Sequence, residues 1–216
     1  MTPTRHRPRL LMAAGLLIWL LTIGTGLGML WAYAGTPGTP AAAAATFPAN
    51  ASFTTDARGP ILVLFLHPQC SCSRATLTEL ARLLAHAPVP AAMYALVYRP
   101  AGAGAGWDQT DVWRSAAAIH GMHVIPDVGG AQARVFGAFV SGQTMVYGAS
   151  GALLFSGGLT SARGHEGDND GRTAVTSILA GGQPATRRTP VFGCYLYGES
   201  DMKAGTASGA ANDAQP

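Results

Sequence analysis

A run of six consecutive apolar residues, Ile61–Leu66, is the feature that most restricts the fold of this 216-residue chain. Pro60 and the pair His67-Pro68 bound the run, and its length is typical of a β-strand covered on both faces. Such a strand needs helices on each side of its sheet, and a helical pattern of leucines follows over residues 72–86. The sequence therefore predicts an α/β domain with this strand at its centre.

Strands and helices alternate over the rest of the chain. We expect further strands over residues 91–98, 124–127, 144–147 and 152–155, and helices over residues 109–120, 131–136 and 172–180. Gly148–Gly151 joins the last two strands and is typical of a hairpin. Parallel βαβ units need right-handed crossovers, and a closing hairpin adds antiparallel strands. The predicted domain, residues 52–198, is a mixed sheet with helices on both faces.

The N-terminal segment, residues 1–34, has the composition of a membrane-spanning helix. No charge interrupts residues 10–34, and about 20 apolar residues suffice to cross a bilayer core. The arginines in front of it place the rest of the chain outside the cytoplasm. Ala32–Ala34 also fits a signal-peptide cleavage site, but the apolar run is longer than an ordinary signal core. We therefore expect a single-pass inner-membrane protein whose domain faces the periplasm, where disulfides persist.

Composition also indicates the nature of the segments before and after this domain and the charge of the domain itself. Residues 35–51 are rich in Pro, Ala and Gly and predict a tether that buries no face, and residues 199–216 predict a disordered tail. The net charge of +3 comes from Arg5, Arg7 and Arg9, because the other 11 basic residues balance 11 acidic ones. A domain without net positive charge lacks the excess of basic residues that is typical of nucleic-acid binding, so we expect no nucleic-acid partner.

Two cysteines stand where the central strand ends and a helix begins. A thiol such as Cys70 at a helix N-terminus faces unpaired backbone N–H groups and the positive end of the helix dipole, which stabilise its thiolate. Cys72 is then able to attack a mixed disulfide on Cys70 and release the partner. A disulfide between Cys70 and Cys72 closes a small, strained ring, which makes it labile. The alternative is a pair of inert, reduced cysteines on a scaffold without activity.

The junction of strand, cysteine and helix, together with the order of elements, resembles the thioredoxin fold. More narrowly, the stretches Ile125–Gly137 and Ser141–Gly151 resemble the membrane-anchored TlpA/ResA-type thiol–disulfide oxidoreductases, over about residues 52–182. His67–Arg74 also resembles a small RedB-like branch. The resemblance implies a thioredoxin-like mixed sheet and disulfide exchange with protein thiols or a membrane redox partner. No cofactor and no resident metal are expected.

The chain departs from this family at three positions. Cys70 and Arg74 match the ends of the family motif Cys-x-x-Cys-Arg, but Ser73 stands at the second cysteine. Gly142 stands where the family has its cis-proline, and Gln69 stands where it has a tryptophan. The resemblance implies that the loop at Gly142 packs beside the cysteines. Candidate substrate-binding residues are therefore His67, Pro68, Ser141, Gly142 and Gln143.

The third cysteine, Cys194, lies in an apolar segment near the C-terminus and has two interpretations. One is a buried, reduced cysteine that packs against the last helix. The other is a third catalytic thiol: a segment that folds back would bring Cys194 to the helix start, where it pairs with Cys72 in a large, unstrained loop. Cys70 would then remain the free attacking thiol.

Two metal-binding alternatives also follow from the sequence. Soft Cu(I) has four candidate ligands in this chain: His67, Cys70, Cys72 and Cys194. The longer cysteine spacing and the distant histidine of the thioredoxin-fold copper-insertion proteins are missing. Residues 163–171 form the densest polar run and offer hard oxygens for a cation. The simpler interpretation of that run is a solvated loop in which Asp168 or Asp170 lies near the start of the last helix.

Overall fold

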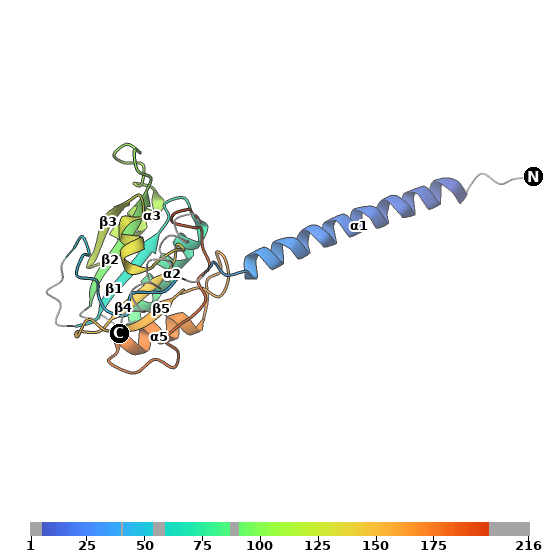
Figure 1. Ribbon diagram of the computed structural model, residues 1–216. Coiled ribbons are helices and arrows are strands. Elements are labelled where there is room, and N and C mark those ends of the chain that lie inside the picture. Colours follow the sequence, from blue (N-terminus) through green and yellow to red (C-terminus); the bar gives the residue numbers. More distant parts are fainter. Residues whose placement is uncertain (1–5, 40, 54–58, 87–90, 199–216) are drawn as a thin grey trace, which may run out of the picture. The chain divides into compact units, whose positions relative to one another are not determined.

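The computed structural model describes residues 6–39, 41–53, 59–86 and 91–198, and the chain divides into two compact units at Thr36/Pro37. The first unit is helix α1 (His6–Gly35), drawn in blue in Figure 1. Its segment Arg9–Gly35 has a mean hydropathy of 2.1 and buries no part of its most apolar window. By length and composition α1 is able to cross a membrane, and a signal sequence has the same properties.

The second unit is a five-stranded mixed sheet with the strand order β3-β2-β1-β4-β5 (Figure 1). The strands are β1 (Ile61–Leu66), β2 (Ala92–Arg99), β3 (Met122–Val128), β4 (Thr144–Tyr147) and β5 (Leu153–Gly157). The helices are α2 (Ser71–His86), α3 (Asp111–Ala117), α4 (Ala131–Phe136) and α5 (Asp170–Leu179). β1, β2 and β3 run parallel, whereas β4 is antiparallel to β1 and β5 to β4. This thioredoxin-like arrangement confirms the predicted fold class.

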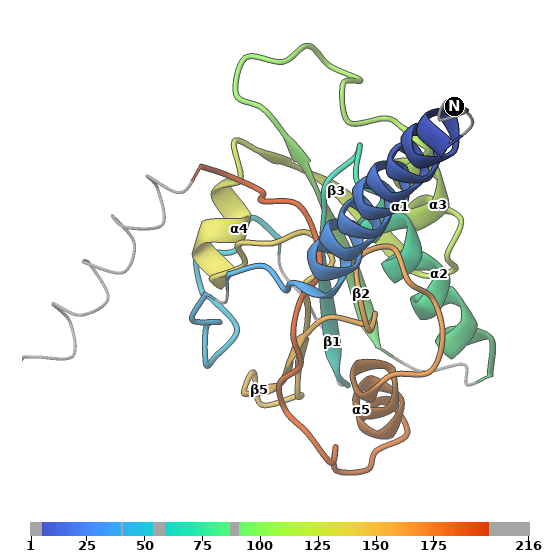
Figure 2. The same cartoon turned by 90° about the vertical axis from the view of Figure 1, so that its right-hand side faces the viewer.

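β1 is the central strand, because its alternate side chains supply both cores of the domain. Residues 62, 64 and 66 belong to the core under α2, α3 and α5, and residues 61, 63 and 65 belong to the core under α4. All six are at most 5% exposed. Figure 2 shows the sheet between α4 on one side and α2 and α3 on the other. The prediction of a strand covered on both faces is confirmed.

We predicted that residues 35–51 form a tether that buries no face, and the structure contradicts this for the described residues. The N–H of Ala44 donates to Phe136 O at 3.0 Å, and that of Phe47 donates to Gly151 O at 2.8 Å. The ring of Phe47 packs edge-on against Phe136 and Tyr147, each with its centroid at 5.5 Å. Phe47 is the large apolar side chain of this segment, and burying it offsets the cost of ordering the small residues around it.

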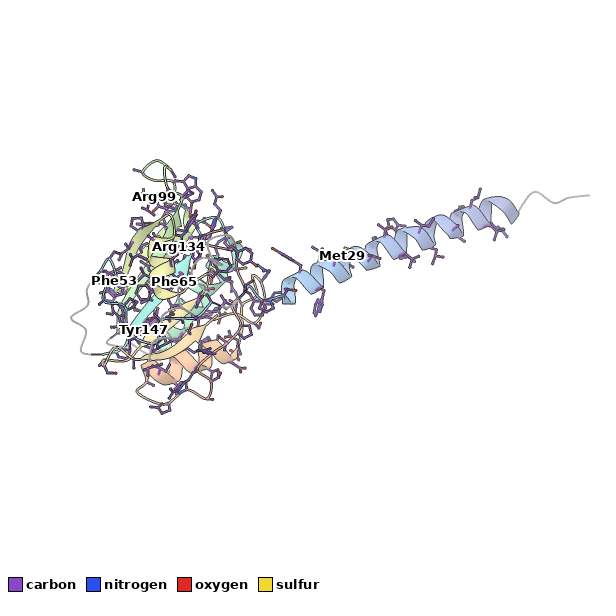
Figure 3. The ribbon with its side chains drawn as sticks, in the orientation of Figure 1. Met29, Phe53, Phe65, Arg99, Arg134 and Tyr147 are labelled. Carbon is purple, nitrogen blue, oxygen red and sulfur yellow. The ribbon has the colours of Figure 1, made fainter. Side chains whose placement is uncertain are left out.

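The same aromatic cluster continues into the residues that follow. Phe53 stacks on Phe136 with a centroid distance of 5.9 Å, and Phe136 contacts Phe65 at 5.6 Å. Figure 3 labels Phe53, Phe65 and Tyr147 from this cluster. The described residues between 41 and 53 therefore pack on the domain. The predicted tail, residues 199–216, lies outside the described residues.

We predict that Phe47→Ala lowers the free energy of unfolding by about 2–3 kcal/mol, because the substitution leaves a cavity among the aromatic rings. Chemical denaturation of the chain checks this. Thr46→Ala is the matched control, since its side chain is exposed and the change is worth less than about 0.5 kcal/mol. Equal effects of the two substitutions would mean that this segment does not pack on the domain.

Candidate active site at the start of helix α2

Cys70 is the residue that directly precedes helix α2. Its carbonyl oxygen accepts hydrogen bonds from the N–H groups of Ser73 and Arg74, and its own N–H donates to His67 O at 3.2 Å. Its side chain is 2% exposed. The structure thus has the predicted junction of buried strand, cysteine and helix, and Cys70 lies at the positive end of the helix dipole.

The loop before β4 lies beside Cys70 because it is hydrogen-bonded to the end of β1. The N–H of Gly142 donates to Phe65 O at 2.7 Å, and the N–H of Phe65 donates to Gln143 O at 3.0 Å. The hydroxyl of Ser141 donates to Cys70 Sγ at 3.5 Å. This agrees with the expected packing of the loop at Gly142 against the thiol site.

Gly142 has φ +86°, a left-handed conformation that a proline cannot adopt. A proline there would also lack the N–H that donates to Phe65 O. A Cβ atom at this position would lie 2.9 Å from Thr76 Oγ1. Local backbone geometry therefore explains why this position is a glycine and excludes a proline.

Three thiols meet at this point. The S–H of Cys194 donates to Cys70 Sγ at a sulfur–sulfur distance of 3.1 Å, and Cys72 also hydrogen-bonds to Cys70. Cys194 is exposed, whereas Cys70 and Cys72 are buried. The interpretation of Cys194 as a buried core cysteine is therefore wrong. Cys194 lies at the helix start, as in the second interpretation, but the thiol that its sulfur contacts at 3.1 Å is Cys70 and not Cys72.

The hydrogen bonds divide the three thiols into one acceptor and two donors. Donation from Cys194, then from Cys72 and Ser141, lowers the pKa of Cys70 well below its ordinary value. The same contacts with Cys70, together with burial, raise the pKa values of Cys72 and Cys194. The contacts therefore favour ionisation of Cys70 over ionisation of Cys72 or Cys194.

Arg163 supplies positive charge next to this cluster. Its guanidinium donates to Gly193 O at 2.6 Å, and its charge acts to lower the pKa values of Cys72 and Cys194. The loop that carries Arg163 is held by Glu79 of α2, which is fully buried and accepts a hydrogen bond from Gly167 N–H at 2.8 Å. Sequence reasoning placed Arg163 in a solvated loop and gave it no role at the thiols.

The end of the same loop lies at the start of helix α5, as expected, because α5 begins at Asp170. Asn169, and not Asp168 or Asp170, caps helix α5, since its side-chain oxygen accepts from Arg172 N–H at 2.9 Å. Asp168 pairs with Arg172 instead. Within the described part of the chain, no group of three or more His, Cys, Asp or Glu side chains is arranged to hold a metal ion.

The remaining predicted substrate-binding residues lie in different surroundings. His67 is partly buried, and burial lowers the pKa of its imidazole. Its Nδ1 accepts from Gln69 N–H at 3.2 Å. Pro68 is buried, and its carbonyl accepts from the Thr110 hydroxyl at 2.8 Å. Gln143 is also buried and donates to Ser156 Oγ at 3.1 Å. Both residues line a cavity whose other walls are residues 37–39, 41, 43 and 188–191.

Two aromatic side chains join His67 at the edge of the site. The ring of His67 stacks on Tyr98 at a centroid distance of 5.6 Å, and Trp107 meets both rings edge-on at 6.3 and 6.4 Å. Sequence analysis did not single out Tyr98. Its signal was its place at the carboxyl end of β2, because parallel strands end at the same edge of a sheet.

Comparison with known proteins supports the fold. No protein-family model and no curated protein sequence matches the chain. A hypothetical protein from Sinorhizobium meliloti 1021 is 23% identical, with a TM-score of 0.55 over 76% of this chain and 96% of its own. An uncharacterized conserved protein from Geobacillus kaustophilus is 16% identical, with a TM-score of 0.53 over 76% of this chain and 93% of its own.

Solved structures similar to this chain also include thioredoxin-like thiol-disulfide oxidoreductases. The thioredoxin domain of such a protein from Bacteroides vulgatus is 14% identical, with a TM-score of 0.38 over 67% of this chain and 98% of its own. The strand order and the helices around the sheet define the fold as thioredoxin-like.

We predict that Cys70 is the thiol whose alkylation by iodoacetamide persists at pH 6, because its depressed pKa keeps it ionised there. Cys72 and Cys194 should slow about tenfold for each pH unit below their raised pKa values. Peptide-resolved mass spectrometry of timed alkylations checks this.

Cys194→Ala should move the midpoint of the Cys70 profile to higher pH by about one pH unit, the effect of removing one hydrogen bond to a charged group. Cys194→Ser retains a donor and is the matched control. Faster alkylation of Cys72 than of Cys70 at pH 6 would reverse the two assignments.

Proposed function

We propose that this chain is a thiol–disulfide oxidoreductase that α1 tethers to the inner membrane, with its domain in the periplasm. The observation that carries the proposal is the Cys70 sulfur, which lies before α2 and accepts hydrogen bonds from two further thiols. A stabilised thiolate with a second thiol in contact is the arrangement that disulfide exchange requires. The fold and the resemblance to TlpA/ResA-type proteins support the same function.

The chemistry proposed for Cys70 is reversible exchange. When Cys70 and a neighbouring thiol join in a disulfide, the pair gives two electrons to a partner disulfide, which becomes two thiols. When the pair is reduced again, a partner dithiol supplies those electrons and becomes a disulfide. No cofactor takes part, because both electrons and protons are exchanged between sulfur atoms.

The partner proposed for this site is a protein with accessible thiols. His67, Tyr98 and Trp107 form an apolar and aromatic edge next to Cys70, which suits a polypeptide better than a small polar molecule. An inert scaffold does not explain why three thiols lie in contact in a compartment where disulfides form and persist. Soft-metal carriage remains an outcome of the test below.

We predict that Cys70→Ser lowers the rate at which the chain equilibrates a dithiol peptide with oxidised glutathione by at least about 100-fold, since the variant has no thiolate at this position. Stopped-flow or quenched assays of peptide oxidation check this. Thr173→Ala, at an exposed position of α5, is the surface control. Full activity of Cys70→Ser together with stoichiometric copper in the reduced, purified chain would instead favour the soft-metal carrier.

A second prediction concerns the membrane tether. Expressed in a Gram-negative cell, the chain should stay in the membrane fraction after carbonate washing and retain its N-terminal peptide, because residues 10–34 are longer than a signal core. Deletion of residues 10–34 should release the domain into the cytosolic fraction. Mass spectrometry of the N-terminus checks this, and a mature chain that begins near Gly35 would replace the anchor by a cleaved signal.

A further inference from the structure

Residues 191–197, called here the C-terminal strap, lie across the thiol site and are paired with the segment that leads into β4. The N–H of Ser141 donates to Cys194 O at 2.8 Å, and the N–H of Cys194 donates to Ser141 Oγ at 2.9 Å. One residue along, Val140 and Tyr195 form an antiparallel bridge. Pairing at Cys194 and at the residue after it thus sets the position of Cys194 relative to Cys70.

The strap is packed into the domain. Phe192 is 7% exposed and Leu196 is 1% exposed, so apolar side chains anchor it before and after Cys194. A Cβ atom on Gly193 would overlap the carbonyl oxygen of Ser141, which means that only glycine permits this close approach. Arg163 also holds the strap in place through its hydrogen bond to Gly193 O.

Distance and exposure distinguish Cys194 from Cys72 as a partner for Cys70. The 3.1 Å between the sulfurs of Cys70 and Cys194 is about 1 Å longer than a disulfide bond. Their separation of 124 residues closes a large loop without local ring strain, whereas Cys70 and Cys72 are two residues apart. Of these three thiols, Cys194 is the one that is exposed.

We propose that Cys70 and Cys194 form the redox disulfide of this protein, and that Cys194 is the sulfur that a substrate thiol attacks. The inference rests on the proposed function and identifies the partner sulfur, the direction and the substrate class, an accessible protein dithiol that becomes oxidised. A substrate reaches the exposed Cys194 sulfur directly, whereas the Cys70 sulfur is buried behind it.

The exchange begins when a substrate thiolate attacks Cys194 Sγ of the Cys70–Cys194 disulfide. The bond between Cys194 and Cys70 breaks, a mixed disulfide forms on Cys194, and Cys70 leaves as a thiolate. The hydroxyl of Ser141 and the thiol of Cys72 donate hydrogen bonds to that leaving group. A thiolate departs faster the lower its pKa, so the contacts that stabilise the Cys70 thiolate also direct the attack to Cys194.

In the second step, the other substrate thiolate attacks the substrate sulfur of the mixed disulfide. The substrate disulfide forms, and Cys194 leaves as a thiolate and takes up one proton, after which its S–H donates to Cys70 as in this structure. The substrate loses two electrons, which reduce the Cys70–Cys194 bond, and its second proton enters the solvent. A low-molecular-weight disulfide, or the disulfide of a redox partner protein, oxidises the pair again.

Disulfide mapping tests the pairing directly. The full-length chain in detergent is oxidised with oxidised glutathione, blocked with N-ethylmaleimide and digested without reductant. Peptides that contain Cys70 and Cys194 should be crosslinked, with Cys72 modified by the blocking reagent, at least tenfold over the Cys70–Cys72 form. Cys72→Ser should retain the crosslink.

The attacked sulfur is identified in a second measurement. The oxidised chain is mixed with an excess of a one-cysteine peptide and quenched with acid, and the adduct is expected on Cys194. With a two-cysteine peptide and oxidised glutathione, Cys194→Ser and Cys194→Ala should each slow peptide oxidation at least tenfold. Both variants change an exposed position, and cooperative thermal unfolding confirms that they fold.

A crosslink confined to Cys70 and Cys72, an adduct on Cys70, or an oxidation rate of Cys194→Ser within twofold of the unmodified chain each overturns the inference. If Cys70→Ser still loses activity in those cases, the proposed function stands with Cys72 as the partner thiol. If Cys70→Ser keeps its activity, the proposed function itself fails.

Discussion

The backbone of Phe65 carries the two hydrogen bonds on which the thiol site depends. Its carbonyl accepts from Gly142 N–H, and its N–H donates to Gln143 O. These bonds hold the loop before β4 against the end of the central strand, so that Ser141 lies beside Cys70. Ser141 in turn pairs with Cys194, which brings the C-terminal strap to the same point. One strand end thus organises three segments that are far apart in the sequence.

The site is a buried charge with its hydrogen-bond donors already in place. A thiolate with the low exposure of Cys70 loses its hydration, and burial by itself acts to raise its pKa. Donors from Cys194, Cys72 and Ser141 outweigh that penalty. The charge therefore depends on the strap, and any reaction that removes the Cys194 proton changes the environment of Cys70.

The segments at both ends of the domain meet next to this site. The N–H of Gly38 donates to Val191 O at 2.8 Å, and the hydroxyls of Thr39 and Tyr195 are 3.3 Å apart. Phe47 then inserts into the aromatic cluster on the α4 face of the sheet. The residues that enter the domain therefore support the strap that presents Cys194, which gives a structural role to a segment of low complexity.

Sequence alone determined the elements whose signals are local. The apolar run of β1 and the helical period of α2 predicted the junction that carries Cys70, and the uncharged residues 10–34 predicted α1. The bounds of β1, α4 and β4 agree with those expected, because each element is short and lies between residues that favour turns. The alternation of strands and helices predicted the mixed sheet, whereas the thioredoxin-like fold was implied by the resemblance and the strand order came from the structure.

Only the tertiary structure decided which groups meet at the thiols. The contact between Cys70 and Cys194 spans 124 residues and depends on backbone hydrogen bonds. Because every residue except proline has the same backbone donor and acceptor, such bonds cannot be predicted from residue types. For the same reason, the sequence did not predict that residues 41–47 pack on the domain or that Arg163 lies next to the thiols. Periodicity reports which face of an element is buried, but the segment that covers that face is chosen by packing across the whole domain.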